Sequence, residues 1–185
     1  TAAEAADLIR DGMTLGVSGF GAFASPDYVM EAMSRKFKEQ NTPRDLTIVS
    51  GVAPGDFVED GCGLSKIKDE GIIKTLIASH LRMSPAIGRA CSENKIAAFS
   101  MPLGVYGQLM NAIGGKRPGI ITHVGLNTYA DPRQDGCKMN ELAKADGREL
   151  VELIHVSGKD YLFYKAFHID ACILHASYAD TEGNI

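Results

Sequence analysis

The feature that most constrains the fold is a regular alternation of short apolar runs with segments of helical periodicity. In one such segment Val29, Met30, Met33 and Phe37 recur every three to four residues, which places them on one face of a helix. The run "LTIV" at 46–49 is apolar almost throughout and is typical of a strand buried on both faces. The pattern predicts an α/β fold in which helices cover both faces of a mostly parallel sheet.

The order of the predicted elements along the chain follows from the same periodicity and from its breakers. Helices are predicted at 2–10, at 85–93, at 103–113, and after Ser25, which would be the N-cap with Pro26 as the first helical residue. Strands are predicted at 13–17, 46–49, 72–78, 96–100, 120–124 and 169–176, the last one buried. The segment 127–148 is rich in Gly, Asp, Asn and Lys and is predicted to be exposed. Residues 149–167 are predicted to form a late antiparallel hairpin turned at 157–160.

Charge, hydropathy and cysteine usage exclude several classes of partner. The formal net charge of −4 favours neither nucleic acid nor an anionic membrane surface. No apolar run approaches the roughly 20 residues of a membrane span, so we expect no membrane insertion. The four cysteines form no C-x-x-C pair, which predicts neither a metal site nor a disulfide framework. We expect reduced thiols and a cytoplasmic protein.

Candidate ligand-binding residues lie where predicted strands give way to helices, because open parallel sheets bind ligands beyond the carboxyl ends of their strands. Three segments fall there, at 19–26, 50–55 and 101–104. The first could present backbone N–H groups to an anion, but it has neither a Walker loop nor a full dinucleotide fingerprint. On pattern alone, a ligand cradle and a structural turn remain equally open.

The histidines add little to this prediction. His155 and His175 lie within apolar runs and are predicted to be packing residues, whereas His80 and His123 follow or end strands and are better placed for a cleft. No catalytic triad order or H-E-x-x-H motif is present.

At these same segments the sequence resembles the N-terminal domain of family I coenzyme A transferases of the acetate/propionate and 3-oxoacid type. Asp11-Gly12, Gly19-Phe20 and Pro26 match the family's first signature with its spacing, while Gly16, Ser18 and Ala24 depart from it. The similarity continues through 101–119, 122–133, 150–170 and 179–185, and therefore covers nearly the whole chain.

The resemblance implies a substrate pocket bordered by Gly19, Phe20, Gly21, Ala24, Pro26, Pro102, Leu103 and Gly104. Family members often carry Gln where this chain has Leu103, which suggests a more apolar acid group here. The substrates implied are an acyl-CoA and a short-chain carboxylate, with no further cofactor. The family's glutamate nucleophile lies in a second half, so the resemblance implies no catalytic residue within residues 1–185.

The resemblance also implies a C-terminal CoA transferase domain or subunit as partner, and a homo-oligomer. The chain stops directly after a predicted strand with no closing helix, so we expect one domain, 1–185, that is incomplete at its C-terminal end. Two other classes remain open. One is a non-catalytic binding or regulatory module of the same fold. The other, drawn from the glycine loop alone, is a sugar-phosphate isomerase or nucleotide-binding domain.

Overall fold

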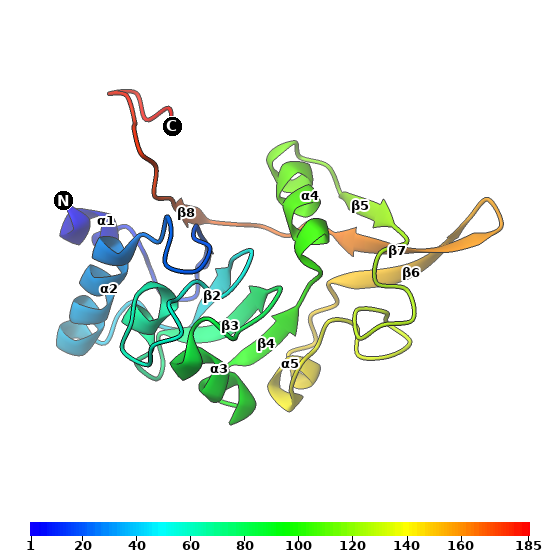
Figure 1. The fold of residues 1–185 in the computed structure, drawn as a ribbon, viewed down its shortest axis with the longest axis horizontal. Coiled ribbons are helices and arrows are strands. Elements are labelled where there is room, and N and C mark those ends of the chain that lie inside the picture. The colour runs from blue at the N-terminus through cyan, green and yellow to red at the C-terminus, as the bar shows by residue number, and fades with distance from the viewer.

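The computed structural model describes residues 1–185 and contains a five-stranded parallel sheet beside a three-stranded antiparallel sheet (Figure 1). The parallel sheet has the order β4-β3-β2-β1-β8, with β1 at Thr14–Val17, β2 at Leu46–Val49, β3 at Ile73–Ala78, β4 at Ala97–Ser100 and β8 at Ala171–Ile173. The antiparallel sheet has the order β5-β7-β6, with β5 at Gly119–Thr122, β6 at Val151–Val156 and β7 at Lys159–Lys165. The predicted α/β class is confirmed.

Alternate residues of the parallel strands point into two separate hydrophobic cores, as the two-residue period of a strand requires. Leu15, Ile48, Leu76 and Ala98 stand in register across the sheet and belong to the first core. The next row, Val49, Ile77 and Phe99, belongs to the second core. Both faces of the sheet are therefore buried, which explains why these strands are nearly continuous apolar runs.

Helices cover the two faces unequally. The first core is closed by α1 (Ala2–Asp7), α2 (Asp27–Gln40), the 3-10 helix η1 (Gly63–Ile67) and α3 (Pro85–Ser92). The second core is closed by α4 (Leu103–Gly114), α5 (Glu141–Ala145) and one face of the antiparallel sheet. Figure 1 shows α4 and the antiparallel sheet on one side of the molecule and α1, α2 and β8 on the other. None of the helices has the length and apolar composition needed to span a bilayer.

The late hairpin is confirmed. Strands β6 and β7 pair from Val151 with Tyr164 to Val156 with Lys159, and the turn falls at Ser157-Gly158. Both turn residues have positive φ, 51° and 78°. This left-handed pair is the geometry that matches the twist of a two-residue hairpin.

Two predictions about individual segments are wrong. The N-cap of α2 is Pro26, not Ser25: Pro26 has a non-helical ψ of 55°, so the helix begins at Asp27. The buried hydroxyl of Ser25 has no hydrogen-bond partner. The last strand is short and only partly buried, because β8 is the edge strand beside β1.

The segment 127–148 is not exposed throughout. Ala130, Asp131, Cys137 and Ala143 are buried. The chain passes antiparallel to the free edge of β4, where Ser100 N–H donates to Cys137 O at 2.8 Å and Met139 N–H donates to Ala98 O at 2.9 Å. Most other residues of the segment are exposed, as predicted, and its buried residues lie where its turns pack against the sheet edge.

The histidine predictions are also partly wrong. His155 and His175 are exposed, His155 on the hairpin and His175 beyond the end of β8, so neither is a packing residue. His123 follows β5 of the antiparallel sheet and therefore lies outside the parallel-sheet edge where ligands bind. His80 does follow a parallel strand, β3.

Candidate functional site

The carboxyl ends of all five parallel strands lie along one edge of the sheet, and the three predicted segments meet there. A Cβ atom on Gly19 would stand 2.9 Å from Cβ of Pro54, which places the loop after β1 directly against the loop after β2. Gly55 N–H donates to Gly21 O at 3.0 Å. A Cβ atom on Gly51 would stand 3.5 Å from Cδ1 of Leu103, at the start of α4. Residues about eighty positions apart in the sequence thus form one surface.

The loop after β1 folds back on itself between Phe20 and Phe23. The N–H group of each residue donates to the carbonyl of the other, at 3.0 Å and 3.1 Å. Gly21 and Ala24 have φ values of 62° and 53°, a region that glycine enters without strain and alanine does not. Two of the N–H groups that could have bound an anion are therefore used within the loop, and both phenyl rings are exposed.

Leu103 and Tyr106 form an apolar shelf above Gly51. They lie three residues apart on α4 and so share one face of the helix. A Cβ on Gly51 would stand 3.3 Å from Cε1 of Tyr106, so any side chain there would press on the ring. Leu103 remains 46% exposed, which means that it is not buried in helix packing and can face a ligand. Burial raises the pKa of the Tyr106 phenol, which therefore stays protonated. We call these three residues the Leu103–Tyr106 shelf.

A ladder of serine hydroxyls, which the sequence analysis missed, ties the strand ends together. Ser50 Oγ donates to Val17 O at 2.8 Å, Ser79 Oγ donates to Gly51 O, and Ser100 Oγ donates to Ser79 O at 2.9 Å. Each serine ends or follows a parallel strand and reaches the neighbouring strand's end. Each of these serines directly follows the last apolar residue of its strand, and this recurrence was the sequence signal that could have revealed the ladder. These bonds hold the backbone of the edge in one arrangement.

The carboxylates nearest this edge have structural partners. Asp27 Oδ1 accepts from Gly63 N–H at 2.9 Å, and Asp56 accepts from Val58 N–H and Cys62 N–H at 3.2 Å and 3.3 Å. Both side chains hold the loop of residues 54–63 in place. The other residues described at this edge carry no charge, so the surface that the chain presents there is largely uncharged.

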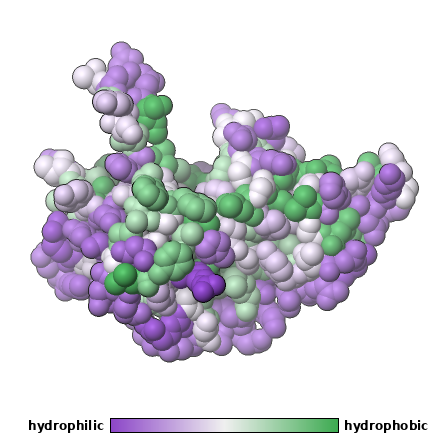
Figure 2. Space-filling view, in the orientation of Figure 1, coloured by the Kyte–Doolittle hydropathy of each residue, from purple (hydrophilic) through white to green (hydrophobic).

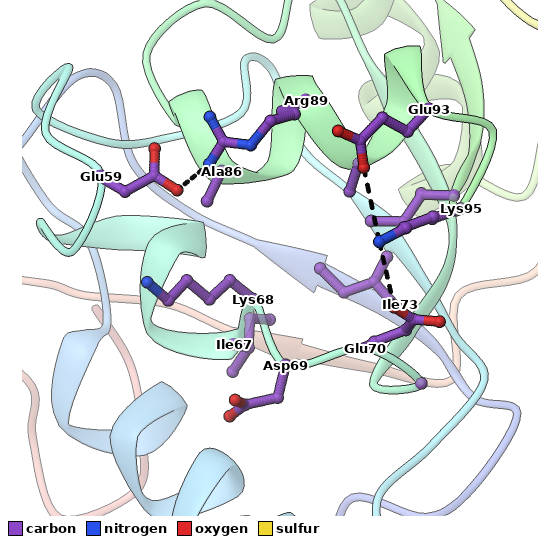
Figure 3. A pocket seen from close by; sticks show the side chains of 13 residues that line it. Glu59, Ile67, Lys68, Asp69, Glu70, Ile73, Ala86, Arg89, Glu93 and Lys95 are labelled. Atoms are coloured by element: carbon purple, nitrogen blue, oxygen red, sulfur yellow. Dashed lines mark hydrogen bonds and ion pairs between the residues drawn. The ribbon is translucent and has the colours of Figure 1, made fainter.

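A separate hollow of about 330 Å³ lies between η1 and α3 (Figure 3). Five of its charged side chains are paired with one another: Arg89 with Glu59, and Lys95 with Glu70 and Glu93 at 3.4 Å and 3.5 Å. The other two, Lys68 and Asp69, pair with Asp60 and Lys38 outside the hollow. Figure 3 shows Lys95 reaching between the two carboxylates. Its floor includes Ile73 and Ile96, at the amino-terminal side of β3 and β4, so it is not part of the carboxyl edge.

A parallel sheet with loops packed at its carboxyl edge is typical of α/β proteins that bind ligands there. Comparison with known proteins identifies the family. The sequence model of the family described as "Coenzyme A transferase" matches residues 1–185, and the chain belongs to that family. The resemblance drawn from the glycine loop and the later segments is confirmed.

Individual relatives make the similarity specific. The chain is 42% identical over 185 residues to caffeate CoA-transferase of Acetobacterium woodii, covering 100% of this chain and 34% of that protein. It is 37% identical to acetate CoA-transferase YdiF of Escherichia coli strain K12, covering 99% of this chain and 34% of the relative. The apoenzyme structure of YdiF from Escherichia coli O157:H7 superposes with a TM-score of 0.87 at 35% identity, over 94% of this chain and 33% of that one. The chain thus spans about a third of the length of these relatives.

Proposed function

We propose that this chain is the N-terminal portion of an enzyme that transfers CoA between an acyl-CoA and a short-chain carboxylic acid. The observation that carries the proposal is the packing of three loops at the carboxyl edge, Gly19 against Pro54 and Gly51 against Leu103, in a chain that belongs to the CoA transferase family. In this proposal the edge forms one wall of the acid pocket.

The chemistry would depend on a glutamate in a second half. Its carboxylate attacks the thioester carbonyl and expels the CoA thiolate, which leaves an acyl-glutamyl anhydride. The thiolate then attacks the glutamyl carbonyl and releases the first acid, leaving a glutamyl-CoA thioester. A second carboxylate reverses the sequence. The acceptor carboxylate, a poor nucleophile, therefore never has to displace CoA from the donor thioester directly. The exchange is divided into easier steps through the anhydride and the glutamyl-CoA thioester, which is the advantage of covalent catalysis.

An apolar border along the carboxyl edge supports a partner domain or subunit. Phe20, Phe23 and Leu174 are 57%, 82% and 55% exposed. Figure 2 shows hydrophobic surface gathered between the C-terminal segment and the region of α4 and β5. Acetate CoA-transferase subunit alpha of Escherichia coli is 25% identical over 185 residues, and this chain covers 72% of it. We propose that a C-terminal CoA transferase domain or a separate subunit covers this border, and that the assembly is a homo-oligomer.

Two acid classes are candidates, because one relative is named for acetate and another for caffeate. The Leu103–Tyr106 shelf favours an acid with an apolar body over acetate itself. We also propose a cytoplasmic location, since all four cysteines are free thiols, as is usual in a reducing compartment.

The test is CoA transfer by the complete protein, with acetyl-CoA as donor and a series of acids from propionate to phenylpropanoate as acceptors. We expect CoA to pass from acetyl-CoA to the acceptor acid, so that a new acyl-CoA forms and no net hydrolysis of the thioester occurs. Binding of acyl-CoA without any exchange would instead support the non-catalytic module, for which Ala24 and Leu103 are the motivating departures. Binding of a sugar phosphate without acyl-CoA binding would support the remaining alternative, a sugar-phosphate isomerase or nucleotide-binding domain.

A further inference from the structure

Ser18, the first residue after β1, makes hydrogen bonds to two segments that are far apart in the sequence. Its backbone N–H donates to Ile173 O at 3.1 Å, which continues the pairing of β1 with β8. Its hydroxyl accepts from His175 N–H at 2.9 Å and donates its single proton to Ala24 O at 2.8 Å. Ser18 therefore joins the loop after β1 to the chain that leaves β8.

The two segments that Ser18 joins lie at the apolar border of the carboxyl edge. Figure 1 shows the loop after β1 beside β8 and the chain that leaves it. Phe23, directly before Ala24, and Leu174, directly before His175, are both exposed members of that border. The hydroxyl of Ser18 thus connects the two sides of the surface that the proposed second half would cover.

The hydrogen bond to Ala24 holds a residue in an unfavourable backbone conformation. Ala24 has a φ of 53°, in the left-handed region that alanine enters only at a cost in free energy. A return to the ordinary region would turn the peptide group and carry Ala24 O away from the hydroxyl. Ser18 and Ala24 are both positions where the chain departs from the family signature, and the structure places the two departures in direct contact.

The rest of the loop has other partners, but Ala24 does not. Phe20 and Phe23 bond to each other, and Gly21 O accepts from Gly55 N–H in the loop after β2. The backbone of Ala24 makes no hydrogen bond to another backbone group. The side chain that follows it, Ser25, has a buried hydroxyl with no partner. The return of the loop toward α2 therefore depends on Ser18.

From these contacts we propose that Ser18 is a positioning residue for CoA transfer, because its hydroxyl holds the loop after β1 in the shape that binds the acid. This inference rests on the proposed function. Ser18 acts through the loop and does not touch the reacting atoms. Without the hydroxyl only a fraction of the molecules would have the binding shape, which raises KM for the acid by the inverse of that fraction. Because kcat is measured with the pocket occupied, it would stay unchanged.

The test compares Ser18 variants of the complete protein, with acetyl-CoA as donor and the acid that the unaltered protein uses best as acceptor. Ser18→Ala should raise KM for the acid roughly fivefold, as loss of one hydrogen bond of ordinary strength does, at constant kcat. Ser18→Thr keeps the hydroxyl and should keep the original KM. Ser92→Ala is the matched control, since Ser92 Oγ also donates to a backbone carbonyl, Gly88 O at 3.0 Å, but at the end of α3.

A second substitution tests whether the hydroxyl acts through Ala24. Glycine enters the left-handed region without strain, so the loop of an Ala24→Gly protein should need the hydroxyl less. In that background Ser18→Ala should raise KM by less than about twofold. Hydrogen exchange followed by mass spectrometry gives a readout that needs no catalysis. The amides of residues 19–25 should exchange faster in Ser18→Ala than in the unaltered protein, and at the original rate in Ser92→Ala.

Two results would overturn the inference. One is an unchanged KM in Ser18→Ala, with a lower melting temperature as the only effect, which would make Ser18 purely structural. The other is an equal rise of KM in Ser18→Ala with and without Ala24→Gly, which would remove the link to Ala24. A complete absence of CoA transfer by the unaltered protein would instead overturn the proposed function, and the exchange rates would still report whether Ser18 holds the loop.

Discussion

Cys172 of β8 occupies the space that a side chain on Gly16 of β1 would need. The two residues are in register as neighbours in the parallel sheet, and a Cβ on Gly16 would stand 2.7 Å from Cys172 Sγ. Gly16 is one of the positions where this chain departs from the CoA transferase signature, which has an apolar residue there. The edge strand therefore explains the departure: the sulfur fills the space that the signature's side chain would take.

This relationship predicts a coupled pair of substitutions. Gly16→Val should lower the free energy of unfolding by about 1–3 kcal/mol, because its methyl groups meet Cys172 Sγ and Ile169. In a Cys172→Ala background the same substitution should cost less, with a coupling of about 1 kcal/mol. Urea unfolding of the four proteins measures the cycle. If Gly16→Val lowers the free energy of unfolding equally in both backgrounds, the Cys172 sulfur is not the reason that this position needs glycine.

Leu103→Gln tests the shelf. An amide can hydrogen-bond a carboxylate or carbonyl, whereas Leu103 offers only apolar contact. We expect the substitution to shift preference from longer or branched acids toward acetate, by about 1–3 kcal/mol in the ratio of kcat/KM values. The melting temperature should change little, because the side chain is 46% exposed. A constant ratio from acetate to a branched five-carbon acid would mean that Leu103 does not face the acid.

Gly21 tests whether the loop after β1 is more than a turn. Its φ of 62° is strained for valine but accessible to asparagine, so Gly21→Val should destabilise the fold by about 1–2 kcal/mol and Gly21→Asn by much less. If the loop borders the acid pocket, Gly21→Asn should still lower kcat/KM. Full activity in a stable Gly21→Asn protein would make the residue purely structural.

The buried Asp131 predicts a specific acid sensitivity. The hydrogen bonds from Arg133, and those from backbone N–H groups, hold the pKa of this carboxyl well below its usual range. Its contribution to stability is therefore complete above the unfolded pKa of about 4 and is lost as the pH falls toward the lower folded value.

Asp131→Asn should remove about 2 kcal/mol at neutral pH, a value reduced by the partial exposure of Arg133. In this variant the free energy of unfolding should fall less steeply between pH 5 and pH 2 than in the natural protein, because one carboxyl with a lowered pKa is missing. Urea unfolding at each pH measures this difference. Parallel pH profiles for the two proteins would contradict the assignment.

Much of the fold was predictable because its signals are local. The strand at 46–49 was placed at its observed bounds, since "LTIV" is buried on both faces and bounded by breakers. The helix beginning at Leu103 and the hairpin turned at Ser157-Gly158 follow from periodicity and turn chemistry within a few residues. The three ligand-edge segments were predicted by the same logic, because strand ends and helix starts are adjacent in sequence.

What only the tertiary structure decided depends on partners distant in the chain. The hydroxyl of Ser100 acquires its role from Ser79, to whose carbonyl it donates. Ala130 and Cys137 are buried although their segment is polar, because its turns satisfy their own hydrogen bonds against a sheet edge. Sequence periodicity reports which face of an element is apolar, but it carries no information on which other element covers that face. For that physical reason the elements were visible in the sequence, whereas the shelf and the serine ladder were not.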